Sequence, residues 1–109
     1  MAMTAQEVFD TVKAHLIQQN TRSQDALGNC LYRAPGGLQC AVGCLLTDEE
    51  AEGIEGRPVY ELDGEGLLPE RLVPHVHLLG DLQALHDNQE PDEWPSALRA
   101  LAKTYGLQA

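Results

Sequence analysis

The sequence predicts an α+β fold that is mainly helical: a single domain over residues 1–109, with about three to four helices and one small β-hairpin near 30–42. Three observations lead to this prediction. Apolar residues recur at helical spacing in three long segments. Two Thr-x-x-Glu sequences have the pattern of a helix-capping box. A Pro-Gly-Gly turn signal divides two short strand-like runs. A chain of 109 residues can bury a core without disulfides or metals.

The first helix is expected from about residue 5 to residue 19. Thr4 precedes it as an N-cap, and Glu7 stands three residues later, as a capping box requires. Apolar residues then follow at helical spacing and predict one buried face: Phe9, Val12 and Leu16. Residues 20–29 are polar and contain a glycine, so we expect a loop there.

The stretch CLYRAPGGLQCAVGC, residues 30–44, holds all three cysteines. A hairpin is expected from the runs 30–33 and 38–42. In the turn between these runs, proline suits the first position and glycine allows a positive φ. A three-residue Pro-Gly-Gly loop sets the register and pairs Tyr32 with Cys40. Four side chains then share one face of the hairpin: Cys30, Tyr32, Cys40 and Val42.

A short helix is expected after this stretch. Thr47 and Glu50 form the second capping box, and the helix should end where the segment 53–69 begins. An alternative begins the helix earlier, near Ala41. The segment 53–69 is rich in glycine and acidic residues and predicts a loop. Within this loop, the run 58–62 is interpreted as a short strand.

Two further helices are expected near the C-terminus. One begins at Pro74, a residue suited to the first turn, and continues to about Asp87. Asp92 is predicted to cap the last helix, with Pro95 in its first turn and Gly106 as its stop. The last helix has apolar residues at helical spacing: Trp94, Leu98, Leu101 and Tyr105. The two helices should form an antiparallel pair beside the first helix.

The chain is strongly acidic, with 17 acids against 7 bases and a net charge of −10. This charge argues against direct binding of nucleic acid, because a phosphate backbone is bound by lysine and arginine. There is no apolar run long enough for a membrane span. Three cysteines, an odd number, and the lack of a signal-peptide pattern indicate a reducing compartment, so we expect a cytoplasmic protein.

The acids gather in two segments. Residues 48–70 hold nine acids and one base, and residues 81–93 hold five acids and no base. One interpretation is a solvated surface that keeps a small protein soluble. The other is a surface whose carboxylates imitate phosphates and bind a basic partner. The candidate partner-binding residues, with Tyr60 as an aromatic anchor, are Asp48, Glu49, Glu50, Glu52, Glu55, Tyr60, Asp63 and Glu65.

The motif Asn-Cys-Leu-Tyr-Arg at 29–33, followed by PGGLQCAVGCLL at 35–46, resembles a small family of phage and prophage proteins of unassigned function. The likeness extends to GDLQ at 80–83, His86-Asp87 and Trp94, and covers about three quarters of the chain. The resemblance implies a gene carried by a bacterial virus and a protein acting in the cytosol of the host. Small acidic phage proteins include inhibitors of defence machinery, anti-CRISPR proteins among them.

The function expected from these features is that of a non-enzymatic protein without cofactor or metal. It would bind and inhibit a host or defence protein that handles nucleic acid, through a basic surface of that partner. The sequence leaves open whether the chain is a monomer or a homodimer.

The alternative function is a small cysteine and histidine enzyme, or a zinc protein, built on Cys40 and Cys44 with His75 and His77. A cysteine near a helix N-terminus can become a thiolate nucleophile. Zinc in a structural site is bound by four ligands, which cysteine and histidine side chains can supply. The C-x3-C spacing is poor for zinc, however, and the cysteines lie among apolar residues. Three free, buried thiols are therefore expected, with the histidines at the surface or at helix ends.

Overall fold

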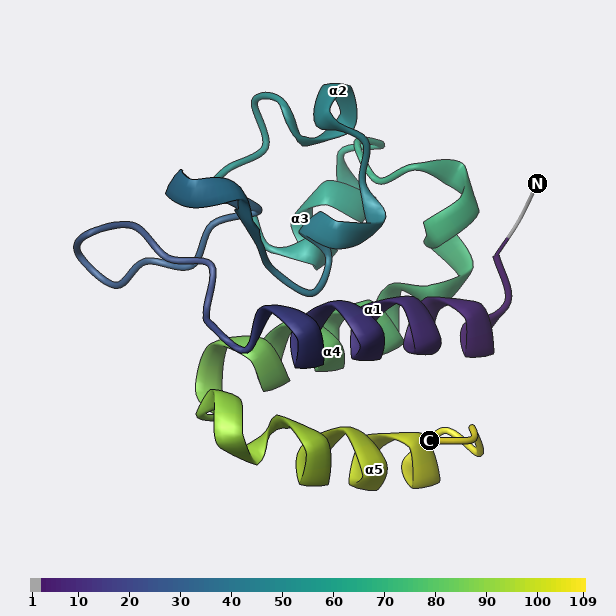
Figure 1. Cartoon of the computed structure of the whole chain (residues 1–109). Coiled ribbons are helices and arrows are strands. Elements are labelled where there is room, and N and C mark those ends of the chain that lie inside the picture. The colour runs from purple at the N-terminus through teal and green to yellow at the C-terminus, as the bar shows by residue number, and fades with distance from the viewer. Residues whose placement is uncertain (1–2) are drawn as a thin grey trace.

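The long helices α1 (Ala5–Gln19) and α4 (Val76–Asn88) lie next to each other in the middle of the molecule (Figure 1). The structure is a computed structural model that describes residues 3–109. Helix α5 (Trp94–Thr104) packs against both α1 and α4 and runs antiparallel to α4. The predicted pair of C-terminal helices beside the first helix is confirmed.

The segment between α1 and α4 covers the side of these helices opposite α5 (Figure 1). It contains the antiparallel strands β1 (Arg33–Ala34) and β2 (Leu38–Gln39) and the short helices α2 (Asp48–Ala51) and α3 (Val59–Gly64). Residues 3–109 thus hold five α-helices and one two-stranded sheet. The predicted class, α+β and mainly helical, is confirmed.

Helix α1 has the predicted bounds because its start is encoded locally. The hydroxyl of Thr4 accepts the backbone N–H of Glu7 at 3.0 Å, and the Glu7 carboxylate accepts the N–H of Thr4 at 2.8 Å. These two bonds satisfy N–H groups that have no partner within the helix. The helix ends at Asn20, which takes a left-handed conformation with φ of 49°.

The hairpin has the predicted register but is shorter than predicted. Arg33 pairs with Gln39 around the Pro-Gly-Gly loop, which is the register that aligns residues 32 and 40. Cys30 does not pair with Val42 and instead forms an isolated bridge with Gln24. The second strand stops because the chain coils after residue 40, where the N–H of Cys44 bonds to the carbonyl of Cys40 at 3.1 Å.

The coil after residue 40 does not become a longer helix. A 3-10 helix over Gly43–Leu45 follows, Leu46 is extended, and α2 begins anew after its Thr47 cap. The alternative start near Ala41 therefore describes one turn only. The predicted capping box of Thr47 and Glu50 is confirmed by both of its hydrogen bonds.

The predicted strand at 58–62 is wrong, since this run lies mostly in α3. Val59 and Leu62 are buried at helical spacing, and the N–H of Leu62 bonds to the carbonyl of Pro58 at 3.1 Å. Pro58 lacks an N–H and stands where a helix needs none, just before the first turn. With α3 added, the number of helices exceeds the predicted three to four.

Two predicted helix starts are corrected. Pro74 lies inside a 3-10 helix over Glu70–His75, and α4 begins only at Val76. Asp92 is not the cap of α5, because it lies in a 3-10 helix over Pro91–Glu93 that leads directly into Trp94. In both places proline permits the tighter helix, and the α-helix begins after it.

The core lies where α1, α4 and α5 meet each other and the covering segment. Its largest fully buried side chains include Trp94, Phe9, Leu16, Leu62, Leu72, Leu79, Leu82 and Leu98. Leucines supply most of this set, as the low aromatic content of the sequence requires. Within residues 3–109, none of the helices has the length and apolar character that crossing a membrane demands.

Candidate functional site

A cleft of about 420 Å³ opens between the hairpin entrance, the 56–60 segment and α4. The 56–60 segment forms one wall and ends in the first turn of α3. Eight of the lining residues carry polar or reactive groups: Cys30, Tyr32, Cys40, Arg57, Tyr60, Gln83, Asp87 and Asn88. The cleft therefore includes part of the cysteine-rich stretch, together with residues that lie far away in sequence.

Asp87, in the last turn of α4, places a carboxylate in this cleft. Its Oδ1 accepts hydrogen bonds from His86 Nδ1 at 2.7 Å and from Gln83 Nε2 at 2.9 Å. Burial by itself would raise the pKa of Asp87, but hydrogen bonds from His86, Cys30 and Gln83 outweigh it and lower the pKa below its ordinary value. Asp87 is therefore ionised at neutral pH.

His86 lies in the last turn of α4, at a helix end as predicted, but its side chain is fully buried. Its Nε2 accepts the backbone N–H of Ser23 at 3.1 Å, so the ring proton must be on Nδ1, which faces Asp87. In this tautomer the ring is neutral. The Trp94 ring stacks on it at a centroid distance of 5.5 Å and holds its orientation.

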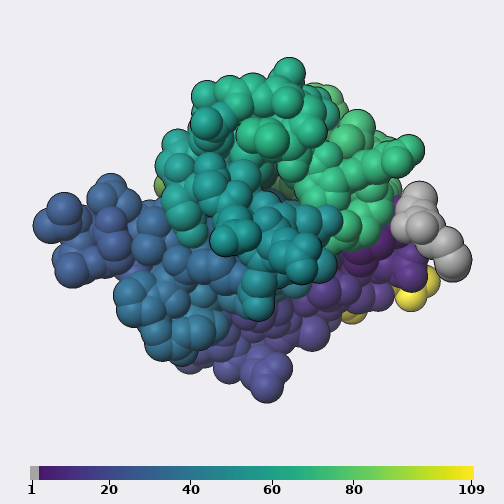
Figure 2. All heavy atoms as spheres, turned by 90° about the horizontal axis from the view of Figure 1, so that it is seen from above, coloured from purple at the N-terminus to yellow at the C-terminus, as the bar shows by residue number. Residues whose placement is uncertain are grey.

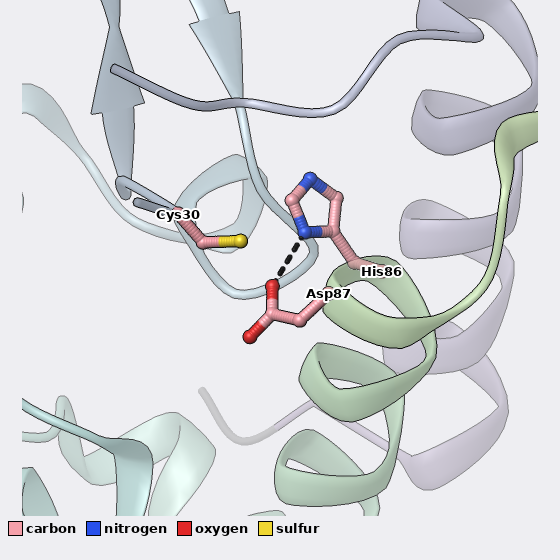
Figure 3. A group of neighbouring side chains, drawn as sticks. All are labelled: Cys30, His86 and Asp87. Carbon is pink, nitrogen blue, oxygen red and sulfur yellow. Dashed lines mark hydrogen bonds and ion pairs between the residues drawn. The ribbon is translucent and has the colours of Figure 1, made fainter. Parts of the chain in front are cut away.

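Cys30 completes a cluster with His86 and Asp87 (Figure 3). The sulfur and the two neighbouring ligand atoms lie within 4.8 Å of one another, a distance compatible with a shared metal ion. A metal on Nδ1 would displace the ring proton to Nε2, where it would face the N–H of Ser23. The donor set fits a hydrogen-bonded cluster better than a metal centre.

The same cluster does not have the arrangement of a thiol nucleophile and its base. A base must offer an unoccupied ring nitrogen to the thiol, but Nε2 of His86 already accepts the Ser23 N–H. Burial, followed by the hydrogen bond to Asp87, raises the pKa of Cys30 to about 11. The thiol thus stays protonated at neutral pH.

The other two cysteines are packing groups. Cys40 is buried, and its sulfur accepts the N–H of Gly43 at 3.2 Å. The Cys44 thiol donates to the carbonyl of Ala41 at 3.1 Å. Burial raises the pKa of both thiols to about 12. All three cysteines are free, as the sequence predicted, but only Cys40 is buried, while Cys30 and Cys44 are partly exposed.

The structure does not assemble Cys40 and Cys44 with the predicted histidines. His75 Nε2 contacts the carbonyl of Met3 at 2.5 Å, and His77 Nδ1 lies 3.4 Å from the Tyr60 hydroxyl. Among the residues that the structure describes, the one group of three potential metal ligands is that of Cys30, His86 and Asp87.

Residues 48–70 form one face of the molecule, which we call the acidic face (teal in Figure 2). Several of its predicted partner-binding carboxylates also have roles inside the chain. Both Glu50 oxygens accept from the Arg71 guanidinium, at 2.6 and 2.8 Å. Asp48 pairs with Arg33 at 3.2 Å, and Glu65 pairs with Arg57.

Glu55 is likewise a structural residue. Its carboxylate accepts the backbone N–H groups of Tyr32 and Arg33 at 2.8 and 2.9 Å, and so fixes the entrance of the hairpin. Half of the predicted partner-binding residues therefore also make contacts within the chain: Asp48, Glu50, Glu55 and Glu65.

The other predicted residues make fewer contacts within residues 3–109. The side chains of Glu49, Glu52 and Asp63 make no hydrogen bond or ion pair within residues 3–109. Tyr60 is half-exposed, and it packs against His77 at a ring-centroid distance of 5.9 Å. It also closes over Gly80 of α4, where an added Cβ would lie 2.8 Å from the tyrosine hydroxyl.

Sequence reasoning missed the cleft residues Gln83, Asp87 and Arg57. Gln83 and Asp87 are one helical turn apart and lie on the same side of α4, which was a usable signal. The sequence pattern places Asp87 only at the end of the predicted helix. Arg57 had no signal, because only the fold brings the 56–60 segment to α4.

The fold and the site together define a small, mainly helical α+β protein with an acidic face and an adjoining cleft. Comparisons with protein-family models, curated proteins and solved structures found no match to this chain. Its function must therefore be argued from its own residues.

Proposed function

We propose that this chain is a non-enzymatic binding protein whose acidic face engages a basic surface of another protein. The partner would be a nucleic-acid-handling protein of a bacterial host or of its defence system, which the chain inhibits in the manner of an anti-CRISPR protein. The observation that carries this proposal is the group of acidic-face carboxylates without a partner within residues 3–109: Glu49, Glu52, Glu61, Asp63 and Glu70.

The charge balance of the acidic face supports the proposal. The segment 48–70 holds nine carboxylates. Three arginines pair with three of them, Arg33 with Asp48, Arg57 with Glu65 and Arg71 with Glu50. Six negative charges then remain uncompensated on one face, and such a field attracts a cationic surface from solution.

The arginines are correspondingly unsuited to holding a phosphate backbone. Arg22, like the three arginines at the acidic face, pairs with a carboxylate of its own chain, here Glu90 at 3.5 Å. Four of the five arginines are thus used inside the fold. This supports a protein partner over direct nucleic-acid binding.

The proposed mechanism is competition for a groove. Carboxylates spaced along the acidic face occupy sites where the partner would bind phosphates, and complementary charge speeds the encounter and fixes its orientation. Because these charges are exposed, salt should weaken the complex strongly at ionic strengths where the Debye length falls below about 10 Å.

The experiment uses purified bacterial nucleic-acid-handling proteins, CRISPR effector complexes included, loaded with fluorescent DNA or RNA. We expect this protein to release the nucleic acid from at least one of them, as measured by fluorescence anisotropy. The double variant Glu49→Lys, Glu52→Lys should reduce release by about tenfold or more, since two attractive charges become repulsive.

The matched control is the double variant Asp10→Lys, Asp92→Lys, which changes the net charge equally but lies outside the acidic face. It should release nucleic acid almost as well as the wild-type protein. Equal loss in both variants would contradict a localised binding face, and no release from any tested protein would contradict the proposed inhibition.

A further inference from the structure

We propose that the cleft is a binding site for one organic cation, namely an arginine side chain of the basic partner, with Asp87 as its counter-charge. The assignment of the arginine to a partner rests on the proposed function. The affinity of the cleft for a guanidinium group does not rest on the proposed function, because this affinity follows from the charges and the shape of the cleft alone.

The first step is that Asp87 has hydrogen bonds but no counter-charge. Its carboxylate is ionised, while His86 is neutral because Nε2 accepts the Ser23 N–H. No arginine or lysine in the described part of the chain forms an ion pair with Asp87. A charge that is only about one third exposed, without a neighbouring cation, is costly to hold and is stabilised by any cation that reaches it.

The second step is that one oxygen of Asp87 remains directed away from the ring. Oδ1 meets both His86 and Gln83, while the other oxygen points away from His86 (Figure 3). The hydrogen bonds to Oδ1 fix the carboxylate, so a cation entering the cleft meets a preorganised acceptor.

The third step is that the size and the lining of the cleft also suit an arginine side chain. A volume of about 420 Å³ is suited to a side chain or a small ligand. Tyr60 lines the cleft, and an aromatic ring provides a surface on which a planar guanidinium can stack. Arg57 also lines the cleft, but its own charge is met by Glu65 outside the lining.

The fourth step is the position of the cleft. Its 56–60 wall belongs to the segment 48–70, so the cleft adjoins the acidic face. The other wall is α4, whose residues Gly80, Gln83 and Ala84 line the cleft beside Asp87. One arginine of a partner docked on the acidic face can then enter the cleft.

The test measures binding of N-acetyl-arginine amide to the full chain by NMR titration. N-acetyl-citrulline amide, which has nearly the same shape but no charge, is the matched control ligand. We expect the arginine compound to bind and the citrulline compound to bind at least about tenfold more weakly. Asp87→Asn should weaken arginine binding to the citrulline level, and Asp92→Asn, outside the cleft, should leave it unchanged.

Since Asp87→Asn also alters the contact with His86, a second variant keeps the test decisive. Ala84→Leu adds volume to the cleft from an exposed helical position and leaves the carboxylate intact. It should abolish arginine binding without loss of helical structure. Equal binding of both ligands, or full binding by Ala84→Leu, would overturn the proposal.

The Glu49→Lys, Glu52→Lys protein separates this inference from the proposed function. It should still bind the arginine compound, even where it no longer releases nucleic acid from a partner. If the arginine compound binds but no tested protein releases nucleic acid, only the proposed function is refuted. Release of nucleic acid without arginine binding would refute only the cleft site.

Discussion

At the scale of single residues, the carboxylate of Glu50 has two roles. It closes the capping box of α2 by accepting the N–H of Thr47 at 2.9 Å, and it receives both branches of the Arg71 guanidinium. Arg71 also donates to the carbonyl of Leu45 at 2.8 Å, so the pair connects α2 to the segment before α4. The hydrogen bond from Arg71 is the main reason why the pKa of Glu50 is lowered to about 2.

This lowered pKa predicts an acid-dependent loss of stability. The contribution of Glu50 is present above its ordinary value of 4.5 and is lost as the pH falls through about 2. Glu50→Gln should flatten the decline in the free energy of unfolding over this range, as measured by urea denaturation at a series of pH values. Glu52→Gln, which removes a carboxylate without a partner in the described chain, is the control and should keep the wild-type slope. Identical slopes for wild type and Glu50→Gln would contradict the structural role.

The thiols provide a second test at the residue scale. Because burial raises the pKa of Cys30 to about 11 from 9.0, even this cysteine should have about a hundredfold less thiolate than an unfolded one. We expect all three cysteines to react slowly with a thiol reagent at mildly alkaline pH, and rapidly once denaturant is added. Rapid reaction of one cysteine in the native protein would instead indicate an accessible thiolate.

At the scale of elements, the turn after β2 depends on a close approach of two backbones. A Cβ added at Gly43 would lie 2.3 Å from the carbonyl oxygen of Tyr32, which is backbone and cannot rotate away. We therefore predict that Gly43→Ala lowers the free energy of unfolding by about 2 kcal/mol. Gly64→Ala is the control, because its Cβ meets nothing within 4 Å, and it should raise stability by about 0.5 kcal/mol. Equal stability of the two variants, measured by thermal and urea unfolding, would contradict the close contact.

The elements that the sequence predicted well are those with local signals. Thr4 and Thr47 start their helices through side chains three residues away, and the Pro-Gly-Gly loop sets the hairpin register by itself. The sequence does not predict helix α3, because the apolar pair Val59 and Leu62, three residues apart, is too short a pattern to distinguish a helix from a strand. Only in the folded chain does the burial of Val59 and Leu62 on one side identify this run as a helix.

At the scale of the whole molecule, the candidate site was predictable only in part. The accumulation of acids over 48–70 is visible in the sequence, but which of them are free is not. Arg33 and Arg71 reach the acidic face from outside the segment and pair with Asp48 and Glu50. The cleft was not predictable, because it forms where the 30–32 run, the 56–60 segment and α4 meet.

We propose that the acidic face and the adjoining cleft, rather than acidic surface in general, receive a basic partner. The most direct measurement is an NMR titration of the isotope-labelled protein with an arginine-rich peptide, following every backbone amide. We expect shifts confined to residues 48–70 and to the cleft side of α4 around Gln83 and Asp87. Shifts that are as large over residues 90–93, where acids also gather outside the acidic face, would contradict this proposal.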